Sequence, residues 1–279
     1  MLKEEADKNV AEIVYSYPYI LNLEKTMPGP FPTVTFTEDR IPEWCCPSCM
    51  VQSLELLPGS FHSQLSAFSL HNRGEDWYDY NHEEFVFTCI LQCRRSCCME
   101  SVAVSGSGRG ECEPDERQEN MVYYTIYRAK SFNPPLPVFS LPEACPEDVK
   151  NQLKMAASLL PISGSSALNS MRIALELLLD SMAIPRFSMD SGKPWPIKLG
   201  KRIERFKDNL GPHYETFHAL KDIGNHASHT DATIRQSHLE GACSLMEDLI
   251  RQLFDQVTDF SQIVRILQDN YGRKQSEEK

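Results

Sequence analysis

Ten cysteines give this sequence its clearest capacity for chemistry, and most of them fall into two clusters. The first, Cys46-Pro47-Ser48-Cys49, is a Cys-x2-Cys turn, which can offer two thiolates to one zinc ion. A tetrahedral zinc site needs two more ligands, and these must come from the second cluster, which contains Cys89, Cys93, Cys97 and Cys98. Both Cys93 with Cys98 and Cys93 with Cys97 are possible pairs. Cys89 is the least suitable ligand because it precedes the turn on an expected strand.

The preferred interpretation is a structural zinc site formed by Cys46, Cys49, Cys93 and Cys98. Disulfides are disfavoured because the charged start of the chain lacks the apolar stretch of a secretory signal. The alternative is that the cysteines are buried without a metal and pack as small hydrophobic side chains. Four thiolates leave no open position for a catalytic water, so the expected role is structural. Three further cysteines are not expected to take part: Cys112, Cys145 and Cys243.

Polar residues at helical spacing form a second candidate site in the C-terminal half. One mostly apolar segment carries four of them on a single face, at Asn169, Arg172, Glu176 and Asp180. A later segment does the same with His218, Asp222, Asn225 and His229, and Gly224 would allow a neighbouring helix to approach closely. The candidate catalytic residues are therefore His229, Asn225, Arg172 and Glu176. The alternative is an ordinary polar surface and a helix end.

A basic stripe forms the third candidate site, on a helix expected at residues 195–210. It consists of Lys198, Lys201, Arg202 and Arg205, with apolar residues on the opposite face. The first interpretation is a solvated face, and the alternative is contact with the phosphates of RNA or of a nucleotide. The glycine-rich run at residues 106–110 is not a phosphate-binding loop, because an acidic segment rather than a helix follows it.

Two kinds of structure must position these residues. Short strands are expected at 34–37, 85–88, 101–104 and 121–127, and a mobile loop at 105–119. Four prolines in Asn133–Pro142 exclude a helix there. Helices are expected at 4–16, 146–160, 163–185, 195–210, 214–229, 233–257 and 260–271. The predicted fold class is α+β: a β-rich zinc-knuckle domain over residues 1–141, followed by an all-α helical bundle over 142–279.

Composition and charge narrow the class of protein further. The chain has 279 residues, 41% of them hydrophobic and 24% charged, which is ordinary for a globular protein. The formal net charge is −11, of which residues 1–141 carry −9. This balance opposes broad affinity for nucleic acid, especially in the cysteine-rich half. No apolar run is long enough to span a membrane, so a soluble cytoplasmic protein is expected.

Several of these motifs, taken in order, resemble a bacterial family, the proteins with domain of unknown function 4145. The matching segments are the CPSC turn, the second cysteine cluster with the following VAVSG, and NPPLPVFSLP. They continue with MRIALELLLD, KLGKRIERF and KDIGNHASH. Together they span about residues 45–255. The resemblance implies an association with restriction and phage-defence loci, and a helical part similar to the HEPN (higher eukaryotes and prokaryotes nucleotide-binding) fold.

Active proteins of the HEPN superfamily are metal-independent ribonucleases that dimerise and pair an Arg-x4-6-His motif from each subunit. In such a site a histidine acts as acid or base and an arginine stabilises the charged transition state. Here glycine, not arginine, stands five residues before His229, and the nearest upstream base is Lys221. Lysine lacks the bidentate fork of arginine. Lys221-x4-His226 has the spacing of the motif with a different cation.

The expected function is therefore a zinc-stabilised assembly module of a bacterial defence system, acting through protein–protein association. The chain is expected to form a homodimer or higher oligomer and to bind a protein partner. One alternative is a metal-independent ribonuclease or toxin that cleaves RNA on infection. The other is a nucleotide or nucleic-acid sensor without catalysis.

Overall fold

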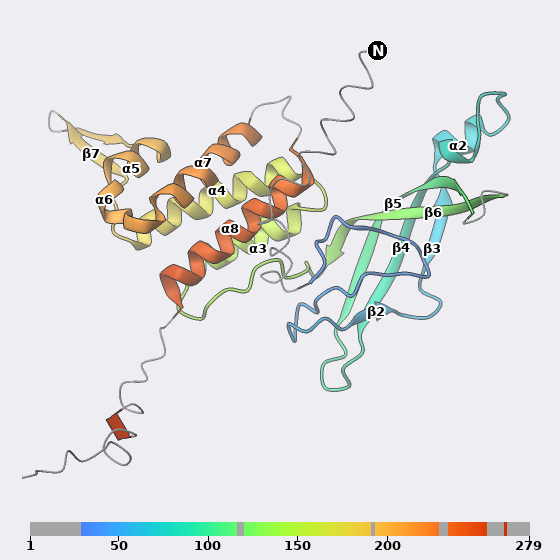
Figure 1. Cartoon of the computed structure of the whole chain (residues 1–279), viewed down its shortest axis with the longest axis horizontal. Coiled ribbons are helices and arrows are strands. Elements are labelled where there is room, and N and C mark those ends of the chain that lie inside the picture. Colours follow the sequence, from blue (N-terminus) through green and yellow to red (C-terminus); the bar gives the residue numbers. More distant parts are fainter. Residues whose placement is uncertain (1–28, 116–119, 191–192, 229–233, 256–264, 267–279) are drawn as a thin grey trace, which may run out of the picture.

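The computed structural model describes residues 29–115, 120–190, 193–228, 234–255 and 265–266. The chain is a mixed α+β protein, with a curled β-sheet followed by a helical region. We call residues 29–133 the β half and residues 146–255 the helical half. Figure 1 shows the two halves next to each other along the long axis of the molecule. The helix expected at 4–16, and nearly all of the one expected at 260–271, lie outside the described residues.

The β half is built on three long antiparallel strands, β4 (Glu84–Cys93), β5 (Ser101–Pro114) and β6 (Met121–Asn133). Three shorter strands complete the sheet: β1 (Thr35–Phe36) pairs with β6, whereas β2 (Leu54–Leu56) and β3 (His62–Leu65) both pair with β4. All four expected strands are present. Alternating burial along β4 and β5 places apolar side chains on one face of the sheet, where they surround the fully buried Trp44.

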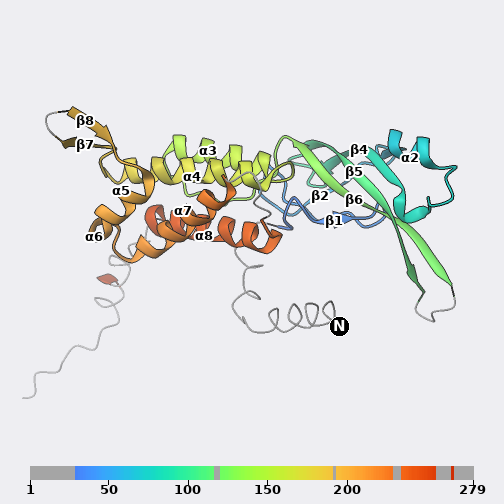
Figure 2. The ribbon, with the colours of Figure 1, turned by 90° about the horizontal axis from the view of Figure 1, so that it is seen from above.

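The loop expected at residues 105–119 is wrong over its first ten residues, which continue strand β5. Cross-strand pairing explains the difference, because Gly106 and Gly108 face β6 residues that leave no space for a side chain. A Cβ atom at Gly106 would lie 2.2 Å from the Arg128 carbonyl oxygen, and one at Gly108 would lie 2.6 Å from the Tyr127 ring. Glycine here permits close packing rather than flexibility. Figure 2 shows the resulting β5–β6 hairpin projecting beyond the rest of the sheet.

Two short helices cover the end of the sheet where β4 begins. Helix α2 (Ala67–Asn72) starts at Ser66, whose hydroxyl accepts the Ser69 N–H at 3.3 Å. The 3-10 helix η2 (Tyr80–His82) packs against β5, and the Tyr80 hydroxyl lies 3.1 Å from the Thr125 hydroxyl on β6.

The helical half contains two long helices that the sequence places correctly, α3 (Glu147–Leu159) and α4 (Gly164–Ser181). Helix α4 is central, and it packs against α3, α7 (Tyr214–Ala227) and α8 (Gln236–Phe254). The Ser163 hydroxyl caps α4 by accepting the Ser166 N–H at 3.2 Å. None of the helices in the described part of the chain is long and apolar enough to cross a membrane.

The single helix expected at residues 195–210 is wrong. Its first residues belong to a β-hairpin of β7 (Phe187–Asp190) and β8 (Lys193–Pro196), and the remainder forms α5 (Leu199–Arg205) and α6 (Lys207–Leu210). Prolines at 194 and 196 are compatible with an edge strand and not with a helix interior. A 3-10 turn, η3 (Gly211–His213), then leads into α7.

The proline-rich segment joins the two halves as a packed strap. It is extended, as expected, and its side chains enter both hydrophobic cores. Leu136 belongs to the core of the β half, whereas Val138 and Phe139 belong to the helical core. Phe31, from the start of the described chain, also packs in the helical core. Segments before residue 142 thus contribute to the helical core. The domain boundary between residues 141 and 142 stays a prediction.

Candidate metal centre

The Cys46–Cys49 turn forms the first knuckle of a four-cysteine cluster. The Cys46 carbonyl accepts the Met50 N–H at 2.9 Å, and the Cys46 N–H donates to the Val51 carbonyl at 2.9 Å. These bonds close a tight loop that ends with Met50 at a φ of 56°, in the left-handed region. Both cysteine side chains of the turn therefore point to the same side.

The second knuckle has a similar backbone turn, although its sequence lacks the Cys-x2-Cys spacing. The Arg95 carbonyl accepts the N–H groups of Cys98 and Met99, at 2.9 and 3.0 Å, and Met99 has a φ of 54°. Arg95 thus occupies the place that Cys46 holds in the first knuckle. The missing thiol comes instead from Cys93, at the end of β4. This is why the spacing is Cys93-x4-Cys98, and not a second Cys-x2-Cys.

The four thiols lie together as a tetrahedral metal site requires. The sulfur atoms of Cys46, Cys49, Cys93 and Cys98 all lie within 4.8 Å of one another. Cys46 Sγ is 3.7 Å from Cys98 Sγ, and Cys49 Sγ is 3.8 Å from Cys93 Sγ. A tetrahedron with Zn–S bonds of about 2.3 Å has S···S edges of about 3.8 Å. These separations are too long for disulfides and fit a bound metal ion.

The other cysteines of the two clusters do not join this group. Cys97 is exposed, so the second knuckle contributes Cys98. Cys89 is buried within the sheet, as expected of a residue in the middle of β4, and burial raises the pKa of its thiol to about 11. Burial, followed by the proximity of Cys49, likewise raises the pKa of Cys45 to about 11. Both are neutral thiols that contribute to packing.

Protonation differs among the clustered thiols. Burial opposes ionisation of Cys49, but hydrogen bonds from the Val51 N–H and from the thiols of Cys93 and Cys46 lower its pKa to about 6. The Glu100 N–H favours the Cys98 thiolate, yet burial and the neighbouring thiols together raise the pKa of Cys98 to about 12. The cluster therefore holds protons that a metal ion would displace on binding.

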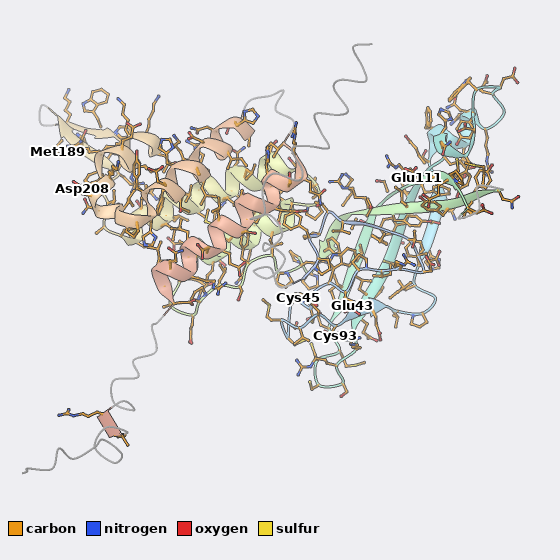
Figure 3. All side chains as sticks on the ribbon, viewed as in Figure 1. Glu43, Cys45, Cys93, Glu111, Met189 and Asp208 are labelled. Atoms are coloured by element: carbon orange, nitrogen blue, oxygen red, sulfur yellow. The ribbon has the colours of Figure 1, made fainter. Side chains whose placement is uncertain are left out.

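Residues around the cluster connect the two knuckles, and sequence reasoning did not single them out. Ser53 Oγ lies 3.1 Å from Cys93 Sγ. The Ser48 hydroxyl of the first knuckle donates to the Glu100 carboxylate after the second, and the Glu100 carbonyl accepts the Cys93 N–H at 2.8 Å. The Arg95 guanidinium lies beside the Cys49 thiol. Such contacts orient metal ligands and offset the negative charge of four thiolates. In Figure 3 the labelled Cys93 lies at the end of the sheet remote from Glu111.

Among the described residues of the helical half, the polar side chains do not come together in one catalytic group. Asp180 instead binds two arginines: its Oδ1 accepts from Arg202 Nη2 at 2.7 Å, and its Oδ2 accepts from Arg186 Nε at 2.7 Å. Arg202 is only 2% exposed and also donates to the Ile184 carbonyl at 2.7 Å. Placing Arg202 on an exposed basic stripe is therefore wrong, since it fastens α5 to the end of α4. Lys198, Lys201 and Arg205 are exposed.

The face of α4 near its start packs against α7. A Cβ atom at Gly224 would lie 3.3 Å from Arg172 Cβ, so the glycine does allow the close approach that its position suggested. Arg172 forms no ion pair with Glu176 among the described residues, and its buried Nε has no hydrogen-bond partner. The Ser228 hydroxyl donates to Asn169 Oδ1 at 2.8 Å. Asn225 is exposed, and His229 lies outside the described residues.

The remaining histidine of the α7 face is paired within its own helix. His218 Nδ1 lies 2.9 Å from Asp222 Oδ2, and Lys221 Nζ lies 2.6 Å from Asp222 Oδ1. The hydrogen bond from Lys221 is the largest of the effects that hold the pKa of Asp222 below its ordinary value. Lys221, the nearest base upstream of His226 and His229, is thus bound to a carboxylate.

Two family models match this chain, one in each half. Residues 154–269 match the model described as domain of unknown function DUF4145. This match supports the family that the motifs of the helical half indicated. Residues 34–135, with both knuckles, match a separate model, domain of unknown function DUF8608. The cysteine turns and the helical motifs therefore fall under different domains. No curated protein and no solved structure matches the chain significantly.

Proposed function

We propose that Cys46, Cys49, Cys93 and Cys98 hold one structural zinc ion, and that the protein serves as a binding and assembly module. The observation that carries this proposal is the closed set of four thiols, with sulfur separations of 3.7 and 3.8 Å. When bound, zinc would cross-link the two knuckles. Because all four positions are taken by protein ligands, none remains for a water or a substrate.

The pairing of polar groups in the helical half also favours a binding role over catalysis. Asp180 accepts hydrogen bonds from Arg186 and Arg202. Asp222 pairs with both His218 and Lys221. The buried contact of Arg202 with Asp180 joins α5 to α4 and so stabilises helix packing, which is a structural role. The DUF4145 match, together with the order of the motifs, supports a HEPN-like accessory subunit of a restriction-type or anti-phage system. It would act as an oligomer or with a protein partner in that system.

One observation favours a second candidate function, that of a metal-independent ribonuclease. Arg172 has no hydrogen-bond partner for its Nε and packs against Gly224, which stands five residues before His229. Phosphodiester cleavage needs a guanidinium beside a histidine, and Arg172 offers a buried Nε that no described group binds.

Zinc content and RNA cleavage, measured on the same purified full chain, separate the two functions. We expect one zinc per chain by elemental analysis and no cleavage of single-stranded RNA in the presence of a chelator. Cleavage that persists with chelator, is abolished in both His229→Ala and Arg172→Ala, and is retained in Cys98→Ser would establish the ribonuclease. Chains without zinc, or with zinc unaffected by Cys98→Ser, would contradict the metal centre.

A further inference from the structure

The β7–β8 hairpin has an apolar surface that nothing in the described chain covers. Phe187, Met189 and Trp195 have exposed fractions of 56%, 71% and 60%. The register pairs Phe187 with Pro196 and Met189 with Pro194, so these four residues share one face. Trp195 lies on the other face, opposite Ser188. A two-stranded hairpin with no sheet or helix against its apolar face leaves that face available to a partner.

The outer edge of β8 is closed to strand addition. The Ile197 N–H donates to the Arg186 carbonyl at 2.8 Å, so odd-numbered residues of this strand direct their N–H groups toward β7. Residues 194 and 196 therefore face outward, and both are prolines, which have no N–H to donate. On this edge of β8 only the carbonyl groups of Pro194 and Pro196 remain for backbone hydrogen bonds, so a partner must bind mainly through side chains.

Basic residues are concentrated in the stretch of sequence that contains this hairpin. Residues 186–207 contain seven Lys and Arg against two Asp and Glu, a net charge of +5 in a chain of −11. Arg186 and Arg202 are paired with Asp180, whereas Lys193, Lys198, Lys201 and Arg205 are exposed and form no ion pair with the described residues. We call Phe187, Met189, Lys198 and Lys201 the hairpin patch.

A patch of the opposite charge lies on the short helices of the β half. Phe68, Leu70 and Trp77 are exposed by 46%, 62% and 50%, and the rings of Phe68 and Trp77 are 6.3 Å apart. Glu75 and Asp76 lie beside them, exposed and without an ion pair to the described residues. Residues 66–84 carry five acidic residues and one basic residue. We call Phe68, Trp77, Glu75 and Asp76 the tip patch.

The two patches lie at opposite ends of the molecule. Figure 1 shows α2 at one end of the long axis and β7 at the other, and Figure 2 shows the same separation from above. One copy therefore cannot bring its own patches together. We propose that the protein associates head to tail, with the hairpin patch of one copy docked on the tip patch of the next. Each patch supplies at least one exposed aromatic ring and charges without an ion pair to the described residues, and the charges of the two patches are complementary.

A nucleic acid fits the hairpin patch less well. The rings of Phe187 and Trp195 are on opposite faces, so one strand of RNA could not stack on both together. Met189 and the two prolines offer no hydrogen bonds to bases, and they favour an apolar protein surface. A head-to-tail contact also uses two different surfaces, so it builds a ring or an open chain of copies.

Charge exchange between the patches tests this association. The hairpin variant is Lys198→Glu/Lys201→Glu, and the tip variant is Glu75→Lys/Asp76→Lys. By sedimentation velocity and light scattering on the full chain, we expect the wild type to associate at low salt and to dissociate as screening increases. Each variant alone should raise the apparent dissociation constant at least about tenfold. An equimolar mixture should recover assembly, because acidic hairpins then meet basic tips and native hairpins meet native tips.

A matched control is Arg128→Glu/Lys130→Glu, which makes the same charge change on exposed residues of β6 that belong to neither patch. It should associate as the wild type does. A wild type that stays monomeric at low salt overturns the proposal, as does a mixture no more assembled than its components. Single-stranded RNA binding by a monomer, lost in the hairpin variant, would assign the patch to nucleic acid instead.

The proposed head-to-tail contact rests on the proposed assembly function, but experiments can refute either one separately. Zinc content and RNA cleavage are measured on the same preparations. A zinc-loaded, non-cleaving chain that does not self-associate removes the head-to-tail contact alone. Metal-independent RNA cleavage removes the proposed function, whatever the state of association.

Discussion

At the scale of single residues, Cys97 and Cys98 are neighbours in sequence but have different surroundings. Cys98 Sγ lies 3.7 Å from Cys46 Sγ, whereas Cys97 is exposed. Backbone hydrogen bonds to Arg95 place the two side chains on opposite sides of the knuckle. We expect Cys98→Ser to abolish stoichiometric zinc binding and to lower the melting temperature, whereas Cys97→Ser should leave both near the wild-type values. Elemental analysis and thermal unfolding measure this. Equal zinc loss in both variants would show that the cluster is assembled differently.

Met50 and Met99 hold left-handed backbone conformations at equivalent points of the two knuckles. A side chain is disfavoured there, and both methionines are about half exposed, so little packing depends on them. We expect Met50→Gly and Met99→Gly each to raise the free energy of unfolding of the zinc-loaded protein by about 0.5–1 kcal/mol. Urea titration measures the change. Ser96→Gly, at an exposed position outside the left-handed region, should not stabilise and serves as the control.

At the scale of elements, Asp180 ties the end of α4 to α5. Burial opposes its ionisation, but hydrogen bonds from Arg186 and Arg202 hold the pKa of this carboxyl below its ordinary value. A depressed pKa stabilises the fold above the unfolded pKa, and this stability is lost as the pH falls. We expect Asp180→Asn to cost about 1–3 kcal/mol at neutral pH, with the difference from wild type disappearing below about pH 4.

The control for that prediction is Asp222→Asn. Asp222 also pairs with two cationic groups, but its side chain is 55% exposed on α7. An exposed pair contributes little, so a loss of at most about 0.5 kcal/mol is expected. Equal losses at both positions would mean that burial of Arg202 does not set the strength of the Asp180 contact.

At the scale of the whole molecule, Glu247 connects the strap to α8. Its Oε1 accepts the Ser140 N–H at 3.0 Å, the residue is fully buried, and Oε2 has no hydrogen-bond partner. Burial raises the pKa of this carboxyl, although the Ser140 N–H opposes the shift. Protonated Glu247 therefore contributes most to folding stability at low pH. This contribution to the free energy of unfolding falls as the pH rises through the raised pKa of Glu247.

We expect Glu247→Gln to raise the free energy of unfolding by about 1 kcal/mol at neutral pH, because the amide keeps an acceptor for Ser140 and removes the buried charge. The gain should disappear at pH values below about 4. Thermal unfolding across this pH range measures it. Glu240→Gln on the same helix should change stability by less than about 0.5 kcal/mol. A pH-independent effect of Glu247→Gln would contradict a raised pKa.

Patterns of residues close together in sequence were sufficient to predict several elements of this fold. The apolar periodicity of residues 163–185, with Ser163 as its cap, predicts α4 to within a few residues. The prolines of Asn133–Pro142 predict an extended segment, and Cys46-Pro47-Ser48-Cys49 predicts a knuckle. Each of these depends on residues that are close in sequence, so their physical causes can be read without knowing the fold.

Long-range contacts decided the rest. The choice of Cys98 over Cys97 depends on a turn that matches a knuckle about fifty residues away. Gly106 and Gly108 look like a flexible loop until β6 packs against them, and Arg202 looks like a surface cation until α5 meets Asp180. The residue types and their local spacing specify which groups are available, namely the thiols, the helix faces and the prolines. Which of these groups meet depends on the folded chain, because each such contact joins segments whose proximity no local propensity encodes.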